Sequence, residues 1–451
     1  MVEIFLVIEG VRVPVAGKAD FLILGPVNPG MASGQHGAAN IPSLIHLRLK
    51  ASYNTAGGNT MKLPGINFDS PKYTTLLDNG YPANRLDVAI IGDGYTAAEQ
   101  QMFNEDAQAV VDAFKSIEPM RSYISHFNFH RINVISNESG TIDTHVTPHQ
   151  KPNTALKTFF SPMAERRLIG PDPWVMLVAK ASGAPWDKLL VIVNAPRRGG
   201  ATLLSMTVGY ASRNSRDFPA IMIHEAGHVI AKVIDEYVGD LPDIDFAENW
   251  SLPNFLPWPN VDTNWKRPKW WRWLTPDTPR PTPNVQVNED VVGAFQGAVY
   301  TGKGVYRPQR SCMMRQHSDP FCVVCTEQWL NAIYKRSKIA DGFSPAYELT
   351  DTPLVRDAEE AMTFRAHVLR REDIKTTWRI KKLEQTRWRR RQITHDYLSF
   401  TTTLPANKVA GLTIPTAWAV ECLMEDATER IRTPSVRSRT KQKHRWYVIT
   451  R

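Results

Sequence analysis

The stretch His224-Glu225-Ala226-Gly227-His228 is followed by Val229–Ile234 and then by Asp235-Glu236-Tyr237. On an α-helix, histidines four residues apart lie on one face, with Cβ atoms about 5–6 Å apart. That spacing lets two imidazoles bind one Zn2+, while the glutamate beside the first histidine can act as a general base toward water that the metal acidifies. The pattern predicts a metal-binding helix with His224 and His228 as ligands and Glu225 as the catalytic base.

The residues before this motif favour a helix that starts near position 217. Asp217 can cap its N-terminus, and Pro219 is allowed in the first turn because the amides there lack intrahelical acceptors. Apolar residues follow along the segment: Ile221, Ile223, Val229, Ile230 and Val233. So short a motif also arises by chance on ordinary core helices, and its weight depends on the rest of the chain.

The length and composition are those of a soluble protein with two or three domains. The chain has 451 residues, of which 42% are hydrophobic and 22% charged. No window of 18 uninterrupted apolar residues occurs, so no membrane span is predicted. The first ten residues hold a short apolar run without a basic leader or a small-residue cleavage site, so no signal peptide is predicted there. The compartment does not follow from these features.

The N-terminal half alternates between strand and helix patterns. Leu86–Ile91 is predicted to be a buried strand, and Gly92-Asp93-Gly94 a structural turn rather than a phosphate-binding loop. Thr96 and Glu99 have the spacing of a capping box before an amphipathic helix. Further strands are predicted at Phe127–Ser136, Trp174–Val178 and Leu189–Val193, with an edge strand within Ala201–Val208. This order is that of zinc peptidases, in which a mixed sheet backs the metal helix and its edge strand binds peptide.

The last quarter of the chain has a different character. Residues 346–451 contain short alternating segments separated by turns, which predicts a small β-sandwich. They hold 21 Lys and Arg against 13 Asp and Glu, a net charge of +8 out of +9 for the chain. The basic run Lys381–Arg391 is interpreted as a solvated strand face, with a docking patch for an acidic polymer as the alternative.

Three of the four cysteines lie close together in sequence: Cys312, Cys322 and Cys325, with Cys422 apart from them. One Cys-x-x-Cys pair with one neighbour makes half of a zinc ribbon, and no further pair of ligands is evident. A local disulfide from Cys312 to Cys322 or Cys325 is favoured if the compartment is oxidising.

Together these blocks resemble the IgA-peptidase family of zinc metallopeptidases, a metzincin-like group. The resemblance covers about Asn84 to Tyr334, over half of the chain. It is carried by blocks in the same order: Leu86–Tyr95, Phe127–Gly140, Val191–Asn194 before Gly199-Gly200, His224–Tyr237, Val292–Ala298 with Tyr306-Arg307-Pro308, and Cys312–Cys325. Asp351–Arg356 also resembles the start of an accessory module of this family. The substrate in the family name is not carried over to this chain.

The resemblance implies the fold class α+β. A metzincin-like zinc peptidase domain, with a twisted mixed sheet and a metal-binding helix, is expected at residues 75–345. A small immunoglobulin-like β-sandwich, basic in charge, is expected at residues 346–451. Residues 1–74, with short apolar runs between Gly, Pro and Asn, are expected to be a β-leaning N-terminal segment.

The resemblance also implies roles for single residues. His224 and His228 would bind Zn2+, Glu225 would be the general base, and Met314 would be the methionine on a tight turn beneath the metal. The metzincin pattern has a glycine after the second histidine, where this chain has Ala231 and Lys232.

The third ligand departs from the metzincin pattern, because its usual position is Ile234, which cannot bind zinc. Asp235, one residue later, matches the Asp-Glu-Tyr of the family and is the predicted ligand. A continuous helix would carry it about 10.5 Å along the axis from His228, so the helix must break between Ala231 and Ile234. Without a break, the ligand must come from a downstream carboxylate, with candidates Glu236, Asp240, Asp243 and Asp245.

The leading functional hypothesis is a zinc-dependent endopeptidase acting on a protein or peptide substrate. The alternatives are a zinc hydrolase of the same fold acting on a non-peptide or cell-envelope amide, and a binding protein with a vestigial metal site. The intact His224, Glu225 and His228 favour an enzyme. The basic C-terminal domain makes an anionic surface a candidate partner, and no nucleic-acid partner is expected. The resemblance favours a secreted or extracytoplasmic location.

Overall fold

A six-stranded mixed sheet, in the order β3-β5-β4-β8-β10-β9, supports the candidate site. Its strands are β3 (Asn67–Leu77), β4 (Leu86–Asp93), β5 (Phe127–Ile135), β8 (Lys188–Val193), β9 (Gly200–Thr202) and β10 (Val208–Ser212). Four of them are parallel, whereas β3 and β9 run antiparallel at the two edges. The computed structural model describes residues 4–8, 11–15, 63, 65–203, 206–214, 217–239, 257–346, 353–370, 372–391 and 398–451.

The central strand β4 is buried along its whole length, as expected for a parallel strand covered on both faces. The predictions of strands at 86–91, 127–136 and 189–193 are confirmed by β4, β5 and β8. The prediction of a strand at Trp174–Val178 is wrong, because these residues lie in helix α2 (Asp172–Ser182). Pro173 in its first turn and Gly183 at its end, with φ of +83°, are helix boundary signals. The predicted edge strand corresponds to β9, which is shorter than expected.

The Gly-Asp-Gly turn after β4 is structural. Asp93 is fully buried, and its carboxylate accepts hydrogen bonds from the backbone amides of Leu156 and Thr158 and from the hydroxyls of Thr154 and Thr158. One buried carboxylate thus holds the following loop against the sheet. The predicted capping box between Thr96 and Glu99 is present, at the short helix η2 (Ala97–Glu99).

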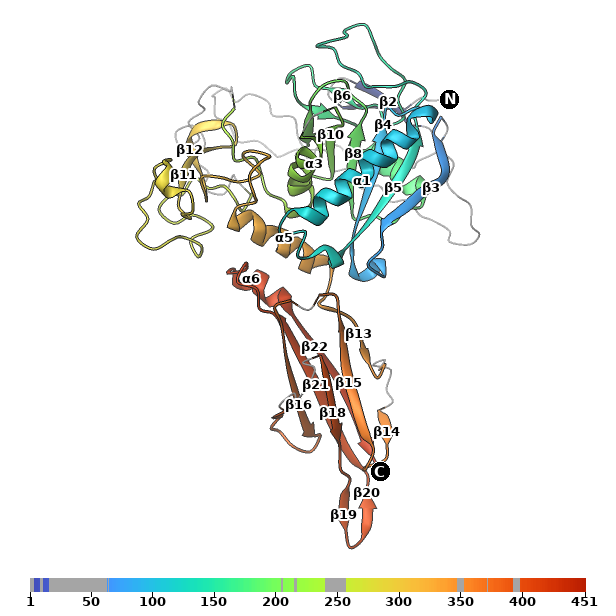
Figure 1. The fold of residues 1–451 in the computed structure, drawn as a ribbon, viewed down its shortest axis with the longest axis vertical. Coiled ribbons are helices and arrows are strands. Elements are labelled where there is room, and N and C mark those ends of the chain that lie inside the picture. Colours follow the sequence, from blue (N-terminus) through green and yellow to red (C-terminus); the bar gives the residue numbers. More distant parts are fainter. Residues whose placement is uncertain are drawn as a thin grey trace, which may run out of the picture. The chain divides into compact units, whose positions relative to one another are not determined.

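Two helices cover one face of this sheet. Figure 1 shows α1 (Gln100–Ser116) and α3 (Phe218–Ala226) side by side, with α3 next to β8 and β10. Their apolar residues share one core with β4, including Phe103, Val110 and Ile221. This core fixes the position of α3, the predicted metal-binding helix.

The described residues between α3 and the C-terminal strands include a hairpin and a long helix. They are β11 (Phe295–Ala298), β12 (Thr301–Arg307) and α5 (Val323–Arg336), and α5 packs against the end of the predicted metal-binding helix. Shorter elements of this half are η1 (Pro82–Asn84), η3 (Ile124–His126), β6 (Phe159–Phe160), β7 (Leu168–Ile169) and η5 (Gln286–Asn288). The separate hairpin β1 (Ile4–Ile8) and β2 (Val11–Val15) lies in the N-terminal segment.

The C-terminal residues form two sheets, one of order β13-β15-β18 and one of order β14-β22-β21-β16-β17. The first contains β13 (Ala340–Ser344), β15 (Ala361–Val368) and β18 (Ser399–Thr403), and the second β14 (Leu354–Arg356), β16 (Ile374–Lys382), β17 (Arg389–Arg391), β21 (Thr416–Asp426) and β22 (Lys441–Thr450). The hairpin β19 (Asn407–Val409) and β20 (Leu412–Ile414) and the helical turns α6 (Pro434–Arg437) and η6 (Ser438–Thr440) complete this part.

Aromatic side chains join the two C-terminal sheets. Trp378 of the larger sheet stacks on Phe400 of the smaller one, and Trp446 contacts Phe364, with ring centroids 5.7 and 5.0 Å apart. Such aromatic contacts fill the space between sheets packed face to face. The chain is therefore of mixed α and β structure, with several sheets and few helices. The metzincin-like and immunoglobulin-like assignments of its parts stay predictions.

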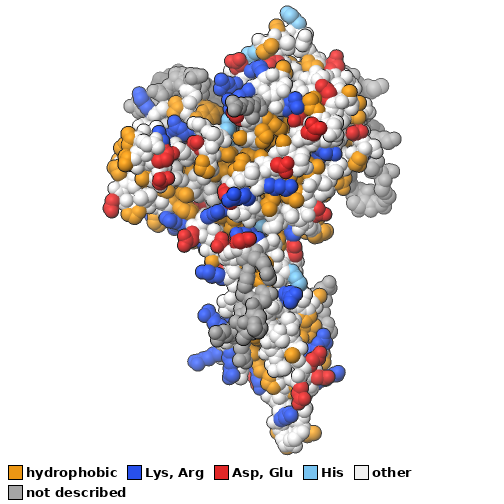
Figure 2. Space-filling view, viewed as in Figure 1, with side chains coloured by type: hydrophobic (Ala, Val, Ile, Leu, Met, Phe, Trp, Pro, Cys, Tyr) orange, Lys and Arg blue, Asp and Glu red, His pale blue; other side chains and the backbone are white. Residues whose placement is uncertain are grey.

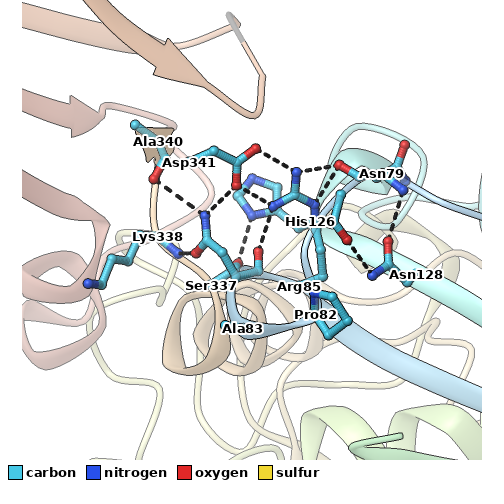
Figure 3. Close-up of polar contacts among 12 residues, drawn as sticks. Asn79, Pro82, Ala83, Arg85, His126, Asn128, Ser337, Lys338, Ala340 and Asp341 are labelled. Atoms are coloured by element: carbon cyan, nitrogen blue, oxygen red, sulfur yellow. Dashed lines mark hydrogen bonds and ion pairs between the residues drawn. The ribbon is translucent and has the colours of Figure 1, made fainter. Parts of the chain in front are cut away.

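The segment from the end of α5 to the start of β13 is tied to the short helices η1 and η3, which precede β4 and β5 (Figure 3). Arg85, which is buried, donates to both carboxylate oxygens of Asp341, and Asn84 donates to the same carboxylate. His126 bonds to Ser337 at 2.8 Å. These contacts anchor the start of β13.

One strand and one strand pairing cross the predicted domain limits. β3 begins at Asn67, before the limit at residues 74 and 75, and β13 precedes the limit at 345 and 346 although it pairs with β15. Gly65–Arg451 forms one compact unit. The predicted limits at residues 74 and 75 and at 345 and 346 therefore stay predictions.

Basic side chains gather on one side of the C-terminal strands (Figure 2). Arg387, Arg389 and Arg390 are exposed, while Arg379 and Lys381 lie over the ring of Trp388. These basic side chains are accessible to a partner. Binding of an anionic surface there stays a prediction. Among the described residues, no helix has the length and apolar character needed to cross a bilayer.

Asp426, at the end of β21, is a carboxylate that connects the C-terminal strands with helix α5 and the segment before β5. It is fully buried and accepts hydrogen bonds from Tyr123, Tyr334 and Arg370. We expect Asp426→Ala to lower the free energy of unfolding by about 3–5 kcal/mol, because it leaves a buried guanidinium and two hydroxyls without their acceptor. Urea unfolding followed by fluorescence measures this.

The control is Glu425→Ala on the same strand. Glu425 is half-buried and pairs with Lys441 at 3.6 Å, so its loss should change stability by less than about 1 kcal/mol. Equal effects of the two substitutions would show that Asp426 does not couple the two parts.

Candidate metal centre

The predicted metal-binding helix ends three residues after His228, at Ala231. α3 continues into a π-helical segment, η4 (Gly227–Ala231), and Lys232 then adopts left-handed backbone angles with φ of +58°. Asp217 occupies the N-cap position and Pro219 the first turn. The left-handed conformation at Lys232 is the one that glycine adopts most easily, so a lysine here is held by its surroundings. Its ammonium group donates to the carbonyl of Met206 at 2.5 Å.

The segment after Lys232 folds back toward the helix, and hydrogen bonds with the Asn260 side chain hold it there. The Asn260 side chain accepts a hydrogen bond from the Ile234 amide at 3.0 Å and donates to the Ile234 carbonyl at 2.8 Å. These two hydrogen bonds resemble those that a neighbouring β-strand would make. They fix the backbone on either side of Ile234. Asp235 therefore faces the two histidines.

Both histidines are oriented by backbone carbonyls. The Nδ1 of His224 lies 3.0 Å from the Met313 carbonyl, and the Nδ1 of His228 lies 2.7 Å from the Val233 carbonyl. Because a carbonyl only accepts, each Nδ1 must carry the proton, and each Nε2 is left as the donor atom for a metal.

The carboxylate of Asp235 meets these Nε2 atoms. Its Oδ1 lies 3.0 Å from His224 Nε2 and 3.3 Å from His228 Nε2, and the three side chains are buried. Among the described residues, these three form one of two groups whose donor atoms lie within 4.8 Å of one another. The structure thus brings together the three side chains predicted as ligands.

Glu225 lies on the same helix and faces the edge of the sheet. Its Oε2 accepts a hydrogen bond from the hydroxyl of Thr202 on β9 at 2.8 Å. Two glycines make room for it: a Cβ at Gly200 would lie 3.1 Å from Glu225 Oε1, and one at Gly209 would lie 3.2 Å from Glu225 Cβ. The base predicted from the motif is therefore oriented by the edge strand.

Met314 lies beneath the helix, on the turn that follows Cys312. A Cβ at Gly227 would come within 2.9 Å of its sulfur, so the methionine contacts the helix between the two histidines. The neighbouring Met313 carbonyl bonds to His224, and the Met314 carbonyl accepts from the Glu236 amide at 2.8 Å. The role of Met314 as a turn methionine beneath a metal stays a prediction.

Charge interactions among these buried groups shift their pKa values. Burial raises the pKa of Glu225. Burial would lower the pKa of His228, but Asp235 overcomes this and raises it to about 9. Burial would raise the pKa of Asp235, but the two histidines hold it well below its usual range. Asp235 therefore stays a carboxylate, the form that binds a cation.

The hairpin β11–β12 supplies a tyrosine that sequence reasoning missed. Tyr300 donates a hydrogen bond to Asp235 Oδ2. It sits with Val299 in the two-residue turn, and both have positive φ, which is rare for a β-branched residue. The Val299 amide bonds to the Asp235 carbonyl, and the Tyr300 amide to that of Tyr237, so the turn is held by the segment it orients. No sequence signal connects Tyr300 with the motif.

His317 was also missed, although it follows the methionine turn closely in sequence. Its ring meets that of His224 edge to face, with centroids 4.9 Å apart, and its Nδ1 accepts from Arg198 at 2.9 Å. Burial and the charges of His224 and Arg198 lower the pKa of His317 to about 4. A half-buried, neutral histidine thus borders the site.

Of the alternative third ligands, the one that the structure describes, Glu236, does not join this group. Glu236 lies beside the cysteines and not beside the histidines. Asp240, Asp243 and Asp245 lie outside the described residues. The predicted disulfide between Cys312 and Cys322 or Cys325 is absent, because all four cysteines of the chain are free and buried.

Two histidines and an aspartate around one point, with a glutamate on the same helix, are the pattern of a metal-dependent peptidase. A family model described as IgA Peptidase M64 matches residues 74–290 and 285–333, more than half of the chain. The chain therefore belongs to the IgA peptidase M64 family, a family of metal-dependent peptidases, and the resemblance seen in the sequence is confirmed. A comparison with curated proteins gives no match.

The ligand role of Asp235 can be tested by removing its carboxylate. We expect Asp235→Ala to lower the affinity for Zn2+ by at least tenfold, because one of three protein donors is lost. Isothermal titration of the metal-free protein with zinc measures this. The matched control is Tyr300→Phe, which removes the hydroxyl bonded to Asp235 but keeps the carboxylate. Wild-type affinity in the Asp235→Ala protein would exclude Asp235 as a ligand.

Proposed function

We propose that this chain is a zinc-dependent endopeptidase of metzincin-like architecture, with His224, His228 and Asp235 as the zinc ligands and Glu225 as the general base. The single observation that carries the proposal is the convergence of two Nε2 atoms and one carboxylate oxygen, next to a glutamate held by the edge strand.

The donor set fits zinc. Each imidazole turns its Nε2 toward Asp235 because its Nδ1 is bonded to a carbonyl, and Asp235 is kept ionised by its neighbours. Two nitrogens and one oxygen are a common set for a catalytic zinc site with a remaining open position. When bound, Zn2+ supplies a Lewis acid that polarises a carbonyl and lowers the pKa of water.

The side chains around it would perform the proton transfers. Glu225 would accept a proton from the attacking water and pass it to the leaving amine, with Thr202 holding the carboxylate in position. Tyr300 would hold the second oxygen of Asp235, which leaves the first for the metal. His317, neutral and beside His224, borders the space where a substrate carbonyl would lie.

A peptide substrate can be bound by strand addition. β9 is the edge strand of the sheet and pairs with β10 among the described strands. On its other side the Gly200 amide donates to the Arg166 carbonyl, so an added strand would pair along Thr202, next to the general base. An extended peptide paired there would place its backbone beside Glu225, which favours a protein or peptide over a non-peptide amide as substrate.

The general base is tested by Glu225→Gln, which keeps the shape of the side chain. We expect zinc content to stay as in the wild type, because Glu225 is not a ligand, while the rate of cleavage falls by about 10²–10⁴-fold. The assay is release of fluorescence from a quenched, generic protein substrate.

Thr202→Val serves as the graded control. It removes the hydroxyl that orients Glu225 and should reduce the rate less than Glu225→Gln does. Near-normal cleavage by the Glu225→Gln protein would assign the proton transfer to another group. Full zinc content with no cleavage by the wild type of any protein or peptide would favour a binding protein instead.

A further inference from the structure

A second group of metal-binding side chains lies beside the candidate metal centre. It consists of Cys312, Cys322, Cys325 and Glu236, whose donor atoms all lie within 4.8 Å of one another. The side chains come from three separate places: the turn before Met313, the start of α5, and the segment that follows Asp235. All four residues are at most 3% exposed.

The distances between these donors are those of a tetrahedral zinc site. With Zn–S of about 2.3 Å and Zn–O of about 2.0–2.2 Å, two sulfur ligands lie about 3.8 Å apart and a sulfur and an oxygen about 3.5 Å. The Cys312 and Cys325 sulfurs are 3.8 Å apart. Glu236 Oε1 lies 3.3 Å from the Cys325 sulfur and 3.8 Å from the Cys322 sulfur.

The carboxylate of Glu236 is incompletely bonded by the protein. Its Oε1 accepts a hydrogen bond from Asn260 at 2.9 Å, whereas its buried Oε2 has no partner among the described residues. An unpartnered oxygen at full burial is costly unless a cation or a proton compensates it. Asn260 also fixes Ile234, so Glu236 is oriented by the same residue that returns the chain to the histidines.

The backbone around the cysteines is arranged to stabilise thiolates. The Cys322 amide donates to the Cys312 sulfur at 3.3 Å, and the Cys325 amide donates to the Cys322 sulfur at 3.4 Å. Cys322 is the N-cap of α5, where the helix dipole favours negative charge. Three sulfur donors select a metal such as zinc over hard cations such as Ca2+ or Mg2+.

A disulfide within this group would explain the arrangement of the four side chains less completely than a bound metal ion would. It would use two of the three thiols and leave the third thiol and the carboxylate of Glu236 in the same buried space without a partner. All three cysteines are free in the structure.

We propose that Cys312, Cys322, Cys325 and Glu236 bind a second, structural Zn2+ in this protein. The site is closed, with four protein donors, in contrast to the three donors of the candidate catalytic site. Two of its ligands are neighbours in sequence of residues of the first site. Glu236 follows Asp235, and Cys312 precedes Met313, whose carbonyl orients His224. The second zinc would therefore hold both the third ligand and the methionine turn in place.

The test is the metal content and zinc X-ray absorption spectrum of the full-length protein, purified with reductant and without added metal. We expect two Zn2+ per chain and a spectrum that contains zinc–sulfur bonds of about 2.3 Å. His224→Ala/His228→Ala should lose one Zn2+ and keep the sulfur signal. Cys322→Ser/Cys325→Ser should lose the sulfur signal and lower the melting temperature, and Cys422→Ser, a buried cysteine on β21, should keep both ions.

The wild-type spectrum decides the matter even if the cysteine variants fail to fold. A single Zn2+ without sulfur ligands, or a native disulfide among the three cysteines detected by mass spectrometry, would overturn the proposal. One Zn2+ with sulfur ligands alone would support it while contradicting the proposed catalytic zinc. The two proposals can therefore fail separately.

Discussion

The chain reverses direction at Lys232, and the arrangement of the whole site depends on this reversal. On a continuous helix Asp235 would lie about 10.5 Å beyond His228 along the axis, too far to share a metal with it. The left-handed Lys232 and the two bonds from Asn260 return the chain, and Asp235 then lies 3.0 Å from His224 Nε2. A non-glycine residue in this conformation costs about 1–2 kcal/mol, which the surrounding contacts must offset.

Several of these contacts come from segments far away in sequence. The methionine turn bonds to His224 and to Glu236, the hairpin turn at Val299 and Tyr300 bonds to the backbone of Asp235 and Tyr237, and β9 holds Glu225. Each contact orients one side chain of the site through a backbone group or a single hydroxyl. Two turns and an edge strand thus position the side chains at the end of one helix, and the core under α3 fixes that helix.

Local patterns were sufficient to predict the elements that carry the chemistry. The spacing of His224 and His228, the capping box at Thr96 and the apolar run of β4 each depend on residues close in sequence, and the family match confirms the resemblance. Trp174–Val178 was assigned wrongly because a short apolar run fits a buried strand and a buried helix equally well. The helix break was predicted from the distance along the axis that a continuous helix would place between His228 and Asp235. Residue preferences did not indicate it, because the residue at the break is Lys232 and not a glycine.

Contacts between distant segments could not be predicted in the same way. Glu236 was weighed as a ligand of the first metal, but the fold places it with three cysteines that sequence spacing could only describe as half a zinc site. Tyr300 and Thr202 reach the site from a hairpin and an edge strand whose registers no local pattern specifies. The pairing of β13 with β15, which lies beyond the predicted limit at residues 345 and 346, is a contact of the same kind that no local pattern specifies.

The central claim is that the reversal at Lys232 makes Asp235 the third protein ligand of a metal held by His224 and His228. The most direct test is a crystal structure of the zinc-loaded protein with anomalous diffraction measured at the zinc absorption edge. The account predicts an anomalous peak within about 2.2 Å of His224 Nε2, His228 Nε2 and a carboxylate oxygen of Asp235. A peak bound by the two histidines and by a different carboxylate, with Asp235 turned away, would contradict it.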